Sequence, residues 1–366
     1  MRNRRLKFIP VFICVFLFFA CASYRESLET SERVVLGLLL ESTDGTPWGM
    51  AGTALIERAR TAGFEVQVRS AAGKDGEARR RLAREMIGSG ANLLVATSSP
   101  GEVSPAPPGS DRSLPVPIIA CGGLIPGLRP AVYVGPDAEE AGSLQFRTAR
   151  ERMTDGGMVL LGGPEGDFNA SRLREGQLGA RAEWGENREE PTDIIADLRL
   201  DPPTTAEGRL HLAELLRDPA GQGGGVSAVL AFNDEVAAGA AAVLAENALA
   251  GKVAVAGRGA SLAACRRIIE GGQLLTLYTP PEDLATAAIR AAIRLARGMD
   301  PGEVAESMDL EPRQLDSGGG PVPAVLLPPV LITRATMVET VILDGLHPIE
   351  AVYGSAGEKP SADDAD

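Results

Sequence analysis

Histidine is nearly absent from this sequence of 366 residues, which contains only two, His211 and His347. Neither lies near another residue that commonly binds metal, and no group of residues has the spacing of a metal site. Histidine-based catalysis and metal binding therefore have no support. No serine occupies a nucleophile elbow either. We therefore expect that the protein binds no metal and no cofactor and is not an enzyme.

Positive charge is in short supply as well: 36 Lys and Arg face 49 Asp and Glu, for a net charge of −13. Nucleic-acid binding needs a basic stripe along one face, so no nucleic-acid partner is expected. The charged run from Glu77 to Arg81 is interpreted as a solvated helix face. Aromatic residues make up only 4%, while Ala, Gly, Val and Leu are frequent, which is typical of α/β proteins with buried parallel strands.

Cysteine is also scarce. Cys121 and Cys265 lie far apart, each in or at the end of a predicted core element. We interpret both as buried small apolar side chains. A disulfide between them is the alternative in an oxidising compartment.

No apolar run near the N-terminus is long enough to span a bilayer, which needs about 20 apolar residues. The run Phe8–Ala20 follows a basic start and precedes Cys21, as in a secretory signal. Residues 17–21 resemble a bacterial lipobox, which implies that 1–21 is the signal and that Cys21 becomes a lipid-modified N-terminus anchored in the membrane. A plain secretory signal and an uncleaved anchor are the alternatives.

Strand-like and helix-like segments alternate along the rest of the chain. Helices are expected at Trp48–Ala62, Glu77–Ile87, Ala138–Arg152, Asn169–Trp184, Thr205–Arg217, Glu235–Ala248, Leu262–Ile269 and Leu284–Arg297. Strands are expected at Val34–Leu40, Phe64–Val68, Ala91–Thr97, Val116–Cys121, Ala131–Val134, Gly157–Leu161, Ile194–Leu200, Ala228–Phe232, Val253–Ala256, Leu274–Tyr278 and Val325–Ile332. Prolines and glycines in Gly101–Pro115 exclude a regular helix there.

Such alternation predicts an α/β fold with parallel sheets, and the length exceeds one core. We expect two doubly wound parallel-sheet lobes joined by a multi-crossing hinge. The crossings are expected near Gly135-Pro136, Thr279-Pro280 and Gly318–Pro323. The expected parts are a tether at 22–32, an N-terminal lobe at 33–134 and 281–319, a C-terminal lobe at 135–280 and 320–352, and a disordered tail at 353–366. Ligands bind beyond the carboxyl ends of such strands, here in a cleft that closes by hinging.

Several segments together carry a resemblance to a known family. They are TPWGMAGTALIERARTAGFEVQVRS from Thr46, GGPEGDFNASRLREGQ from Gly162, AVLAFNDEVAAGAAAVLAENALAGKVAVAG from Ala228, RRIIEGGQLLTLYTPPEDLATAAIRAAIRLARG from Arg266 and TVILDGLHP from Thr340. The chain resembles the type I periplasmic sugar-binding proteins, most closely the D-xylose-binding branch. The resemblance implies a monomer in the periplasm or at the cell surface. It would capture a monosaccharide for the permease subunits of an ABC importer, or serve a membrane sensor.

The resemblance also implies which residues contact the ligand. Trp48 would stack on the sugar ring, or else pack on the core at a helix start. Asp167, Asn169 and Arg174 match polar groups of one family motif, which can bind vicinal hydroxyls. The alternatives are helix capping by Asp167 and an exposed helical charge at Arg174.

Asn233 and Asp234 follow the strand Ala228–Phe232. Side chains at that point can bind sugar hydroxyls or cap the next helix. Both residues are ligand-binding candidates. We favour ligand contact for Asn233 and helix capping for Asp234.

The sequence departs from the family at several contact positions. A second stacking Trp is absent around Asp201-Pro202. Charged contacts of the family are replaced by Pro47, Gly122, Gly123, Gly259 and Thr279. Arg258 and Thr279 are candidate replacements near the cleft. A ligand-poor paralogue that acts as a tethered sensor or interaction protein is therefore the alternative function. A DNA-binding regulator of the same fold would need a helix-turn-helix where this chain has its signal.

Overall fold

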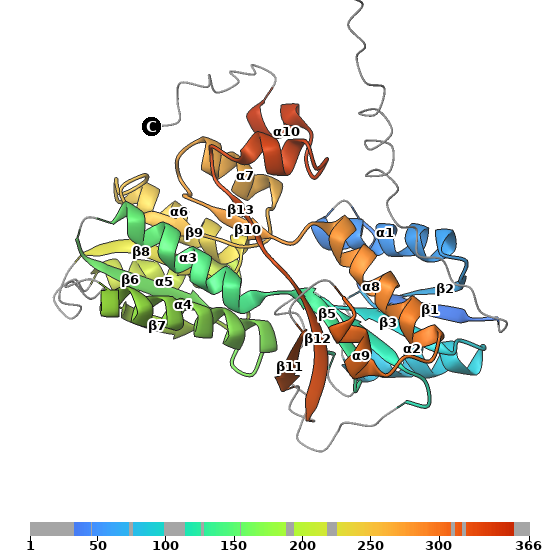
Figure 1. Ribbon diagram of the computed structural model, residues 1–366. Helices are drawn as coiled ribbons and strands as arrows, with labels where there is room; N and C mark the ends of the chain where they lie inside the picture. Colours follow the sequence, from blue (N-terminus) through green and yellow to red (C-terminus); the bar gives the residue numbers. More distant parts are fainter. Residues whose placement is uncertain are drawn as a thin grey trace, which may run out of the picture.

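The computed structural model describes residues 33–44, 46–72, 76–98, 114–125, 128–153, 155–187, 194–217, 225–308, 312–316 and 320–354. Cys21, the tether at 22–32, most of Gly101–Pro115 and residues 355–366 of the predicted tail lie outside the described residues. Within the described parts the chain forms two α/β lobes side by side (Figure 1). The expected fold class is confirmed.

The N-terminal lobe is built on a sheet of seven strands among the described residues, in the order β11-β12-β5-β4-β3-β1-β2. The strands are β1 (Val35–Leu40), β2 (Glu65–Ser70), β3 (Leu93–Thr97), β4 (Ile118–Cys121), β5 (Val132–Pro136), β11 (Pro312–Asp316) and β12 (Pro321–Leu327). Only the edge pair β11–β12 of this sheet is antiparallel. The helices of this lobe are α1 (Pro47–Thr61), α2 (Gly76–Gly88), α8 (Pro281–Ala296) and α9 (Pro301–Glu306).

Alternating side chains of each strand face opposite layers of the N-terminal lobe. In β5, Val132 and Val134 join the core under α1, α8 and α9, whereas Tyr133 faces the other side. On that other side α2 covers part of the sheet. Phe168 of the C-terminal lobe packs against the cluster around Tyr133, so the two lobes share part of one core.

The C-terminal lobe is built on a parallel sheet in the order β7-β6-β8-β9. A single bridge from Ala256 to Leu275 adds β10, which pairs antiparallel with β13. The strands are β6 (Gly157–Gly162), β7 (Ile194–Arg199), β8 (Val226–Ala231), β9 (Ala254–Ala256), β10 (Thr276–Tyr278) and β13 (Val330–Ile332). The helices that cover them are α3 (Ala138–Arg152), α4 (Phe168–Asn187), α5 (Thr205–Arg217), α6 (Asp234–Glu246) and α7 (Leu262–Ile269).

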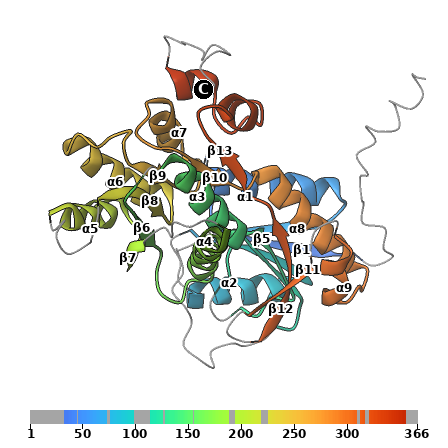
Figure 2. The ribbon, with the colours of Figure 1, turned by 60° about the vertical axis from the view of Figure 1, so that its left-hand side comes forward.

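Two pairs of helices cover opposite faces of this sheet. The pair α3–α4 forms one core layer and α5–α6 the other (Figure 2). Glycines allow α3 and α4 to approach closely: a Cβ at Gly142 would lie 1.9 Å from the Leu173 carbonyl oxygen, and one at Gly176 1.8 Å from that of Glu139. The predicted bounds of α3, α5 and α7 are confirmed residue for residue.

The C-terminal segment adds structure that the pattern did not predict. A short π-helix (Val338–Ile342) and α10 (Ile349–Tyr353) pack with α7 into one apolar cluster. The Tyr278 hydroxyl donates to Asp344 Oδ2 at 2.6 Å, and the ring of the buried His347 bonds the Ala260 carbonyl oxygen at 2.8 Å. The segment therefore holds both the end of β10 and the loop after β9.

The chain crosses between lobes after β5, after β10 and after β12. The first two crossings lie where we expected them. The third does not: residues 320–327 were assigned to the C-terminal lobe, but β12 pairs with β5 in the N-terminal sheet. The expected single strand Val325–Ile332 is in fact two strands, because Pro328 and Pro329 interrupt it and carry the chain across.

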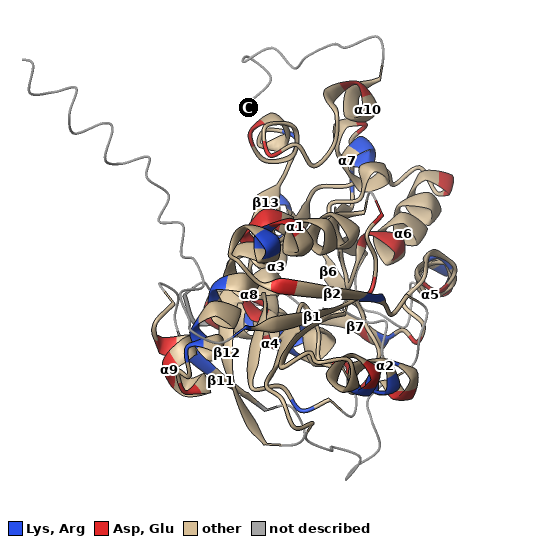
Figure 3. Ribbon diagram, turned by 90° about the vertical axis from the view of Figure 1, so that its right-hand side faces the viewer, with Lys and Arg blue, Asp and Glu red and all other residues tan. Residues whose placement is uncertain are grey.

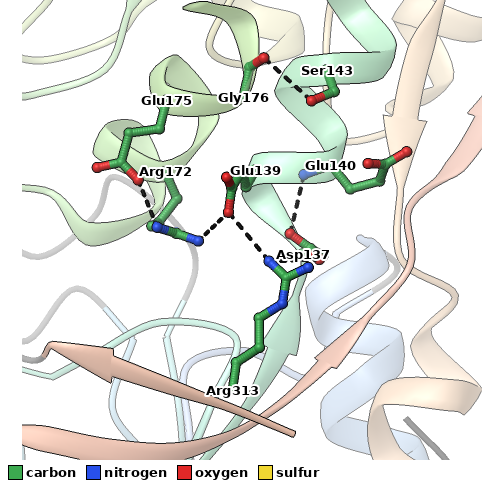
Figure 4. Close-up of polar contacts among 8 residues, drawn as sticks. All are labelled: Asp137, Glu139, Glu140, Ser143, Arg172, Glu175, Gly176 and Arg313. Carbon is green, nitrogen blue, oxygen red and sulfur yellow. Dashed lines mark hydrogen bonds and ion pairs between the residues drawn. The ribbon is translucent and has the colours of Figure 1, made fainter. Parts of the chain in front are cut away.

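An ion-pair network joins the lobes beside the first crossing (Figure 4). Arg313 of β11 donates to Glu139 of α3 at 3.2 Å and lies 3.8 Å from Asp137. Arg172 of α4 pairs with the same Glu139, and with Glu175 at 2.6 Å. Asp137 also caps α3 by accepting the Glu140 amide at 3.1 Å. The network fixes the N-terminus of α3 against the edge of the other lobe.

Both cysteines of the described residues are buried free thiols, as the interpretation without a disulfide predicts. Burial raises the pKa of Cys121 and of Cys265 to about 12. Neither thiol is therefore ionised at neutral pH.

Charges of both signs occur along the outer helices, and α2 carries red and blue residues together (Figure 3). Within the described part of the chain, no helix combines the length and the apolar character that crossing a membrane requires.

Candidate functional site

A cleft of about 960 Å³ opens between the lobes, beyond the carboxyl ends of β1, β8, β9 and β10. The N-terminal lobe contributes Glu41, Ser42, Asp44 and the start of α1 at Thr46, Pro47 and Trp48. The C-terminal lobe contributes Pro202 to Thr205, Phe232 to Glu235, Arg258, Gly259 and Thr279. The position is the one that topology assigns to ligand sites in α/β sheets.

Trp48 lies in the cleft wall, and its ring edge packs on the backbone of Gly122. A Cβ at Gly122 would lie 2.3 Å from Cζ3 and 2.4 Å from Cη2 of Trp48. Gly122 also has φ of +89°, where side chains are strained. The glycine that replaces a charged family position is thus required by the way Trp48 packs here.

Asn169 reaches from α4 to the other lobe, but it is not among the residues that line the cleft. Its Nδ2 donates to the Gly122 carbonyl oxygen at 3.2 Å, and the Tyr133 hydroxyl donates to the same oxygen at 2.9 Å. Phe168 meets the Tyr133 ring edge-on, with centroids 5.6 Å apart. Asn169 is only 1% exposed, and its Oδ1 has no hydrogen-bond partner among the described residues.

The other two residues of the same motif have hydrogen-bond partners within the C-terminal lobe. Asp167 Oδ1 accepts the Ala170 amide at 2.7 Å, so Asp167 caps the start of α4. Arg174 donates from Nε to Asp197 Oδ2 of β7 at 2.7 Å. Neither residue lines the cleft. The structure therefore favours the alternative interpretation for both, capping and a helical ion pair.

The hydrogen bonds of Asn233 and Asp234 differ from the roles that we favoured, which were ligand contact for Asn233 and capping for Asp234. Asn233 is the N-cap of α6: its Oδ1 accepts the Val236 amide at 2.8 Å, and its Nδ2 donates to the Pro203 carbonyl oxygen at 3.1 Å. Asp234 does not cap the helix. It is a buried acceptor whose contacts join α6 to the loop after β9. Both residues line the cleft, but their polar atoms already have protein partners.

Asp234 accepts three hydrogen bonds: from the Ser261 amide at 2.8 Å, from the Thr276 hydroxyl at 2.8 Å and from Gln273 Nε2 at 3.3 Å. Burial raises its pKa above the ordinary value, although these donors oppose the shift. Asp234 thus ties three segments of the C-terminal lobe together behind the cleft.

Two candidate replacements named from the sequence do lie in the cleft. Arg258 Nη1 and Thr279 Oγ1 are buried atoms with no hydrogen-bond partner among the described residues. The Arg258 guanidinium carbon lies 5.0 Å from the centroid of the Phe232 ring. Buried polar atoms are normally bonded, so both atoms are suited to contact a bound molecule.

Glu41 and Phe232 line the cleft but were not predicted from the sequence, and neither was the role of Arg79. Glu41 follows β1 and Phe232 follows β8, at strand ends where topology places ligand sites. Arg79 is only 1% exposed, so its assignment to a solvated helix face was wrong. It donates to the Thr97 carbonyl oxygen at 3.0 Å and lies 3.8 Å from Glu41, which it holds at the cleft.

No cluster of metal-binding residues occurs in the portion of the chain that the structure describes. The site therefore offers hydrogen bonds, an aromatic ring and charge.

Comparison with known sequences yields a match to the family model for a periplasmic binding protein domain over residues 36–300. A D-xylose-binding periplasmic protein from Haemophilus influenzae is 30% identical over 323 residues, which cover 88% of this chain and 93% of that protein. One from Escherichia coli is 27% identical over 317 residues, or 87% of this chain and 92% of that protein.

Solved structures share the fold. A carbohydrate transporter solute-binding protein from Chloroflexus aurantiacus in complex with D-glucose has a TM-score of 0.68 and 20% identity, and covers 88% of this chain and 98% of its own. A Caulobacter protein bound to myo-inositol has a TM-score of 0.60 and 18% identity, with coverage of 85% and 96%.

Proposed function

Because this chain belongs to the family of periplasmic binding protein domains, we propose that it captures a monosaccharide or related polyol in the periplasm or at the cell surface for an ABC permease. It would act as a monomer, by binding and without catalysis. D-xylose is a first candidate because the D-xylose-binding relatives match nearly the whole chain.

The observation that carries this proposal is the set of unpartnered buried atoms around an aromatic wall. In the cleft lining, Arg258 Nη1 and Thr279 Oγ1 lack partners among the described residues, and Trp48 lines the same cleft. A cationic donor and a hydroxyl suit the hydroxyls of a sugar, while an aromatic face suits the C–H groups of the sugar.

A second candidate is a ligand-poor sensor or interaction protein tethered to the membrane. It is favoured by the N-terminal wall, where Gly122 and Gly123 offer no side chain and the ring of Trp48 packs against the backbone. The absence of a tight ligand would distinguish this function from import.

Thermal unfolding of the full chain in mild detergent tests the two candidates. Pentoses, hexoses, polyols and sugar acids are added singly at millimolar concentration. A ligand at a hundred times its Kd stabilises the folded state by ~2.7 kcal/mol, so we expect one compound to raise Tm by several degrees.

Trp48→Ala should weaken that ligand at least about tenfold, or ~1.4 kcal/mol. Trp184→Phe, which changes the other tryptophan far from the cleft lining, should leave it unchanged. If no compound shifts Tm, the receptor proposal fails and the result supports the ligand-poor sensor or interaction protein.

We also propose that Cys21 carries a lipid anchor. Cells that express the full chain and are fed radioactive palmitate should label it, and Cys21→Ala should abolish the label. Cys14→Ala serves as the matched control and should remain labelled. A label that survives Cys21→Ala would contradict the anchor.

A further inference from the structure

Among the described residues, Arg258 is one of two arginines that line the cleft. It follows β9 in the loop that His347 holds through the Ala260 carbonyl oxygen. Its guanidinium rests on the ring of Phe232, and its Nη1 is buried without a hydrogen-bond partner among the described residues. The Arg258 carbonyl oxygen accepts the Asp234 amide at 2.9 Å, which fixes the backbone from which the side chain projects.

The two carboxylates whose charges act on Arg258, Asp167 and Asp234, also accept hydrogen bonds from other donors. Asp167 caps α4 through the Ala170 amide. Asp234 accepts bonds from Ser261, Thr276 and Gln273. Burial lowers the pKa of Arg258 below the ordinary arginine value, although the charges of Asp167 and Asp234 oppose that shift. The positive charge is thus incompletely compensated by the protein.

A second arginine of the cleft lining differs from Arg258, because two of its nitrogens donate hydrogen bonds to the protein. Arg267 donates from Nε to Gln273 Oε1 at 3.1 Å and from Nη2 to the Asp234 carbonyl oxygen at 3.0 Å. Two acidic residues of the lining also have partners within the N-terminal lobe. Glu41 lies beside the buried Arg79, and Asp44 accepts from the Thr46 amide at 3.0 Å.

A guanidinium in a cleft with an unpartnered buried nitrogen matches one ligand group above others. Its planar donors bind a carboxylate through two parallel hydrogen bonds, which are stronger than bonds to a neutral hydroxyl. A neutral sugar would satisfy Nη1 but leave the charge uncompensated, which is unfavourable for a buried ion.

We propose that the preferred ligand is a sugar acid whose carboxylate pairs with Arg258. This inference rests on the proposed function and narrows its ligand from sugars in general to the aldonates and uronates. The Thr279 hydroxyl, whose Oγ1 is also unpartnered among the described residues, belongs to the same lining and would bond the rest of the molecule.

Calorimetric titration of the full chain in mild detergent tests the proposal with matched pairs: D-xylonate against D-xylose, and D-glucuronate or D-gluconate against D-glucose. We expect at least one acid to bind ten times or more tightly than its neutral partner. Its binding should weaken as salt is raised, because the pair is partly screened.

Three variants locate the contact. Arg258→Gln should abolish the preference for the acid, and Arg258→Lys should retain part of it because the charge remains. Arg174→Gln, the same substitution at an arginine outside the cleft, should bind as the wild type does. Unfolding midpoints measured without ligand show whether each variant is folded.

The outcomes separate this inference from the proposed function. Tight binding of neutral sugars without any preference for acids overturns the sugar-acid inference and leaves the receptor intact. An acid preference that survives in a folded Arg258→Gln also overturns it. If neither acids nor neutral sugars bind, both proposals fail.

Discussion

Gly122→Ala is expected to lower the free energy of unfolding by about 2 to 6 kcal/mol. The new Cβ would lie 2.3 Å from Trp48 Cζ3 and 2.9 Å from the Ser98 carbonyl oxygen, at φ of +89°. A left-handed conformation costs a non-glycine residue ~1–3 kcal/mol, and overpacking typically costs another ~1–3. Urea denaturation followed by circular dichroism measures the loss.

The matched control is Gly179→Ala in α4, where nothing lies within 4 Å of an added Cβ. Relief of glycine's entropy in a helix should stabilise this variant by ~0.5–1 kcal/mol. In a Trp184→Phe background, the fluorescence of Trp48 should change with Gly122→Ala and not with Gly179→Ala. Equal stabilities of the two glycine variants would contradict the packing of Trp48 on Gly122.

Asp234→Ala is expected to lower the free energy of unfolding by about 3 kcal/mol. The change removes the acceptor of the Ser261 amide, the Thr276 hydroxyl and Gln273 Nε2. A buried donor left unsatisfied costs ~1–3 kcal/mol, and the loop after β9 loses its tie to α6. The neighbouring exposed carboxylate supplies the control: Glu235→Ala should stay within ~0.5 kcal/mol of the wild type.

The loss in Asp234→Ala should also depend on pH. Burial raises the folded pKa of Asp234 above its ordinary value of 3.8. The contribution of Asp234 to stability is therefore complete below pH 3.8 and is lost as pH rises through the folded pKa. The difference between wild type and Asp234→Ala should be greatest at acidic pH. A difference that grows toward alkaline pH would show that the folded pKa is lowered.

Local pattern was sufficient for most elements of this fold. Apolar spacing and terminal signals located α3, α5 and α7 without error, because capping and periodicity are properties of neighbouring residues. The pattern failed at 320–332, where one apolar run is two strands of different lobes. Which sheet a strand joins depends on partners far away in the sequence, here Val134 for Val325 and Leu277 for Leu331.

The candidate site was predicted only in part for the same reason. Trp48, Asn233 and Asp234 were expected at the cleft and line it. Asn169 reaches Gly122, a contact across 47 positions of sequence. Arg174 matched the motif, but the adjacent strand supplies Asp197, which removes it from the cleft. A motif match predicts which helix or strand carries a residue. The hydrogen-bond partner of its side chain depends on the helix or strand that packs beside it.

The sequence by itself determined that this chain forms strands and helices in alternation, with glycine and proline at the ends of elements and small side chains in the cores. Those choices are settled by backbone sterics and by the periodic burial of apolar groups. Only the tertiary structure decided which polar atoms stay unpartnered. Asp234 accepts hydrogen bonds from three donors of other segments, whereas Arg258, stacked on Phe232, has a buried nitrogen without a hydrogen-bond partner among the described residues. Hydrogen-bond satisfaction is a property of the assembled lobes, because each donor must find its acceptor across distances in sequence that local pattern does not span.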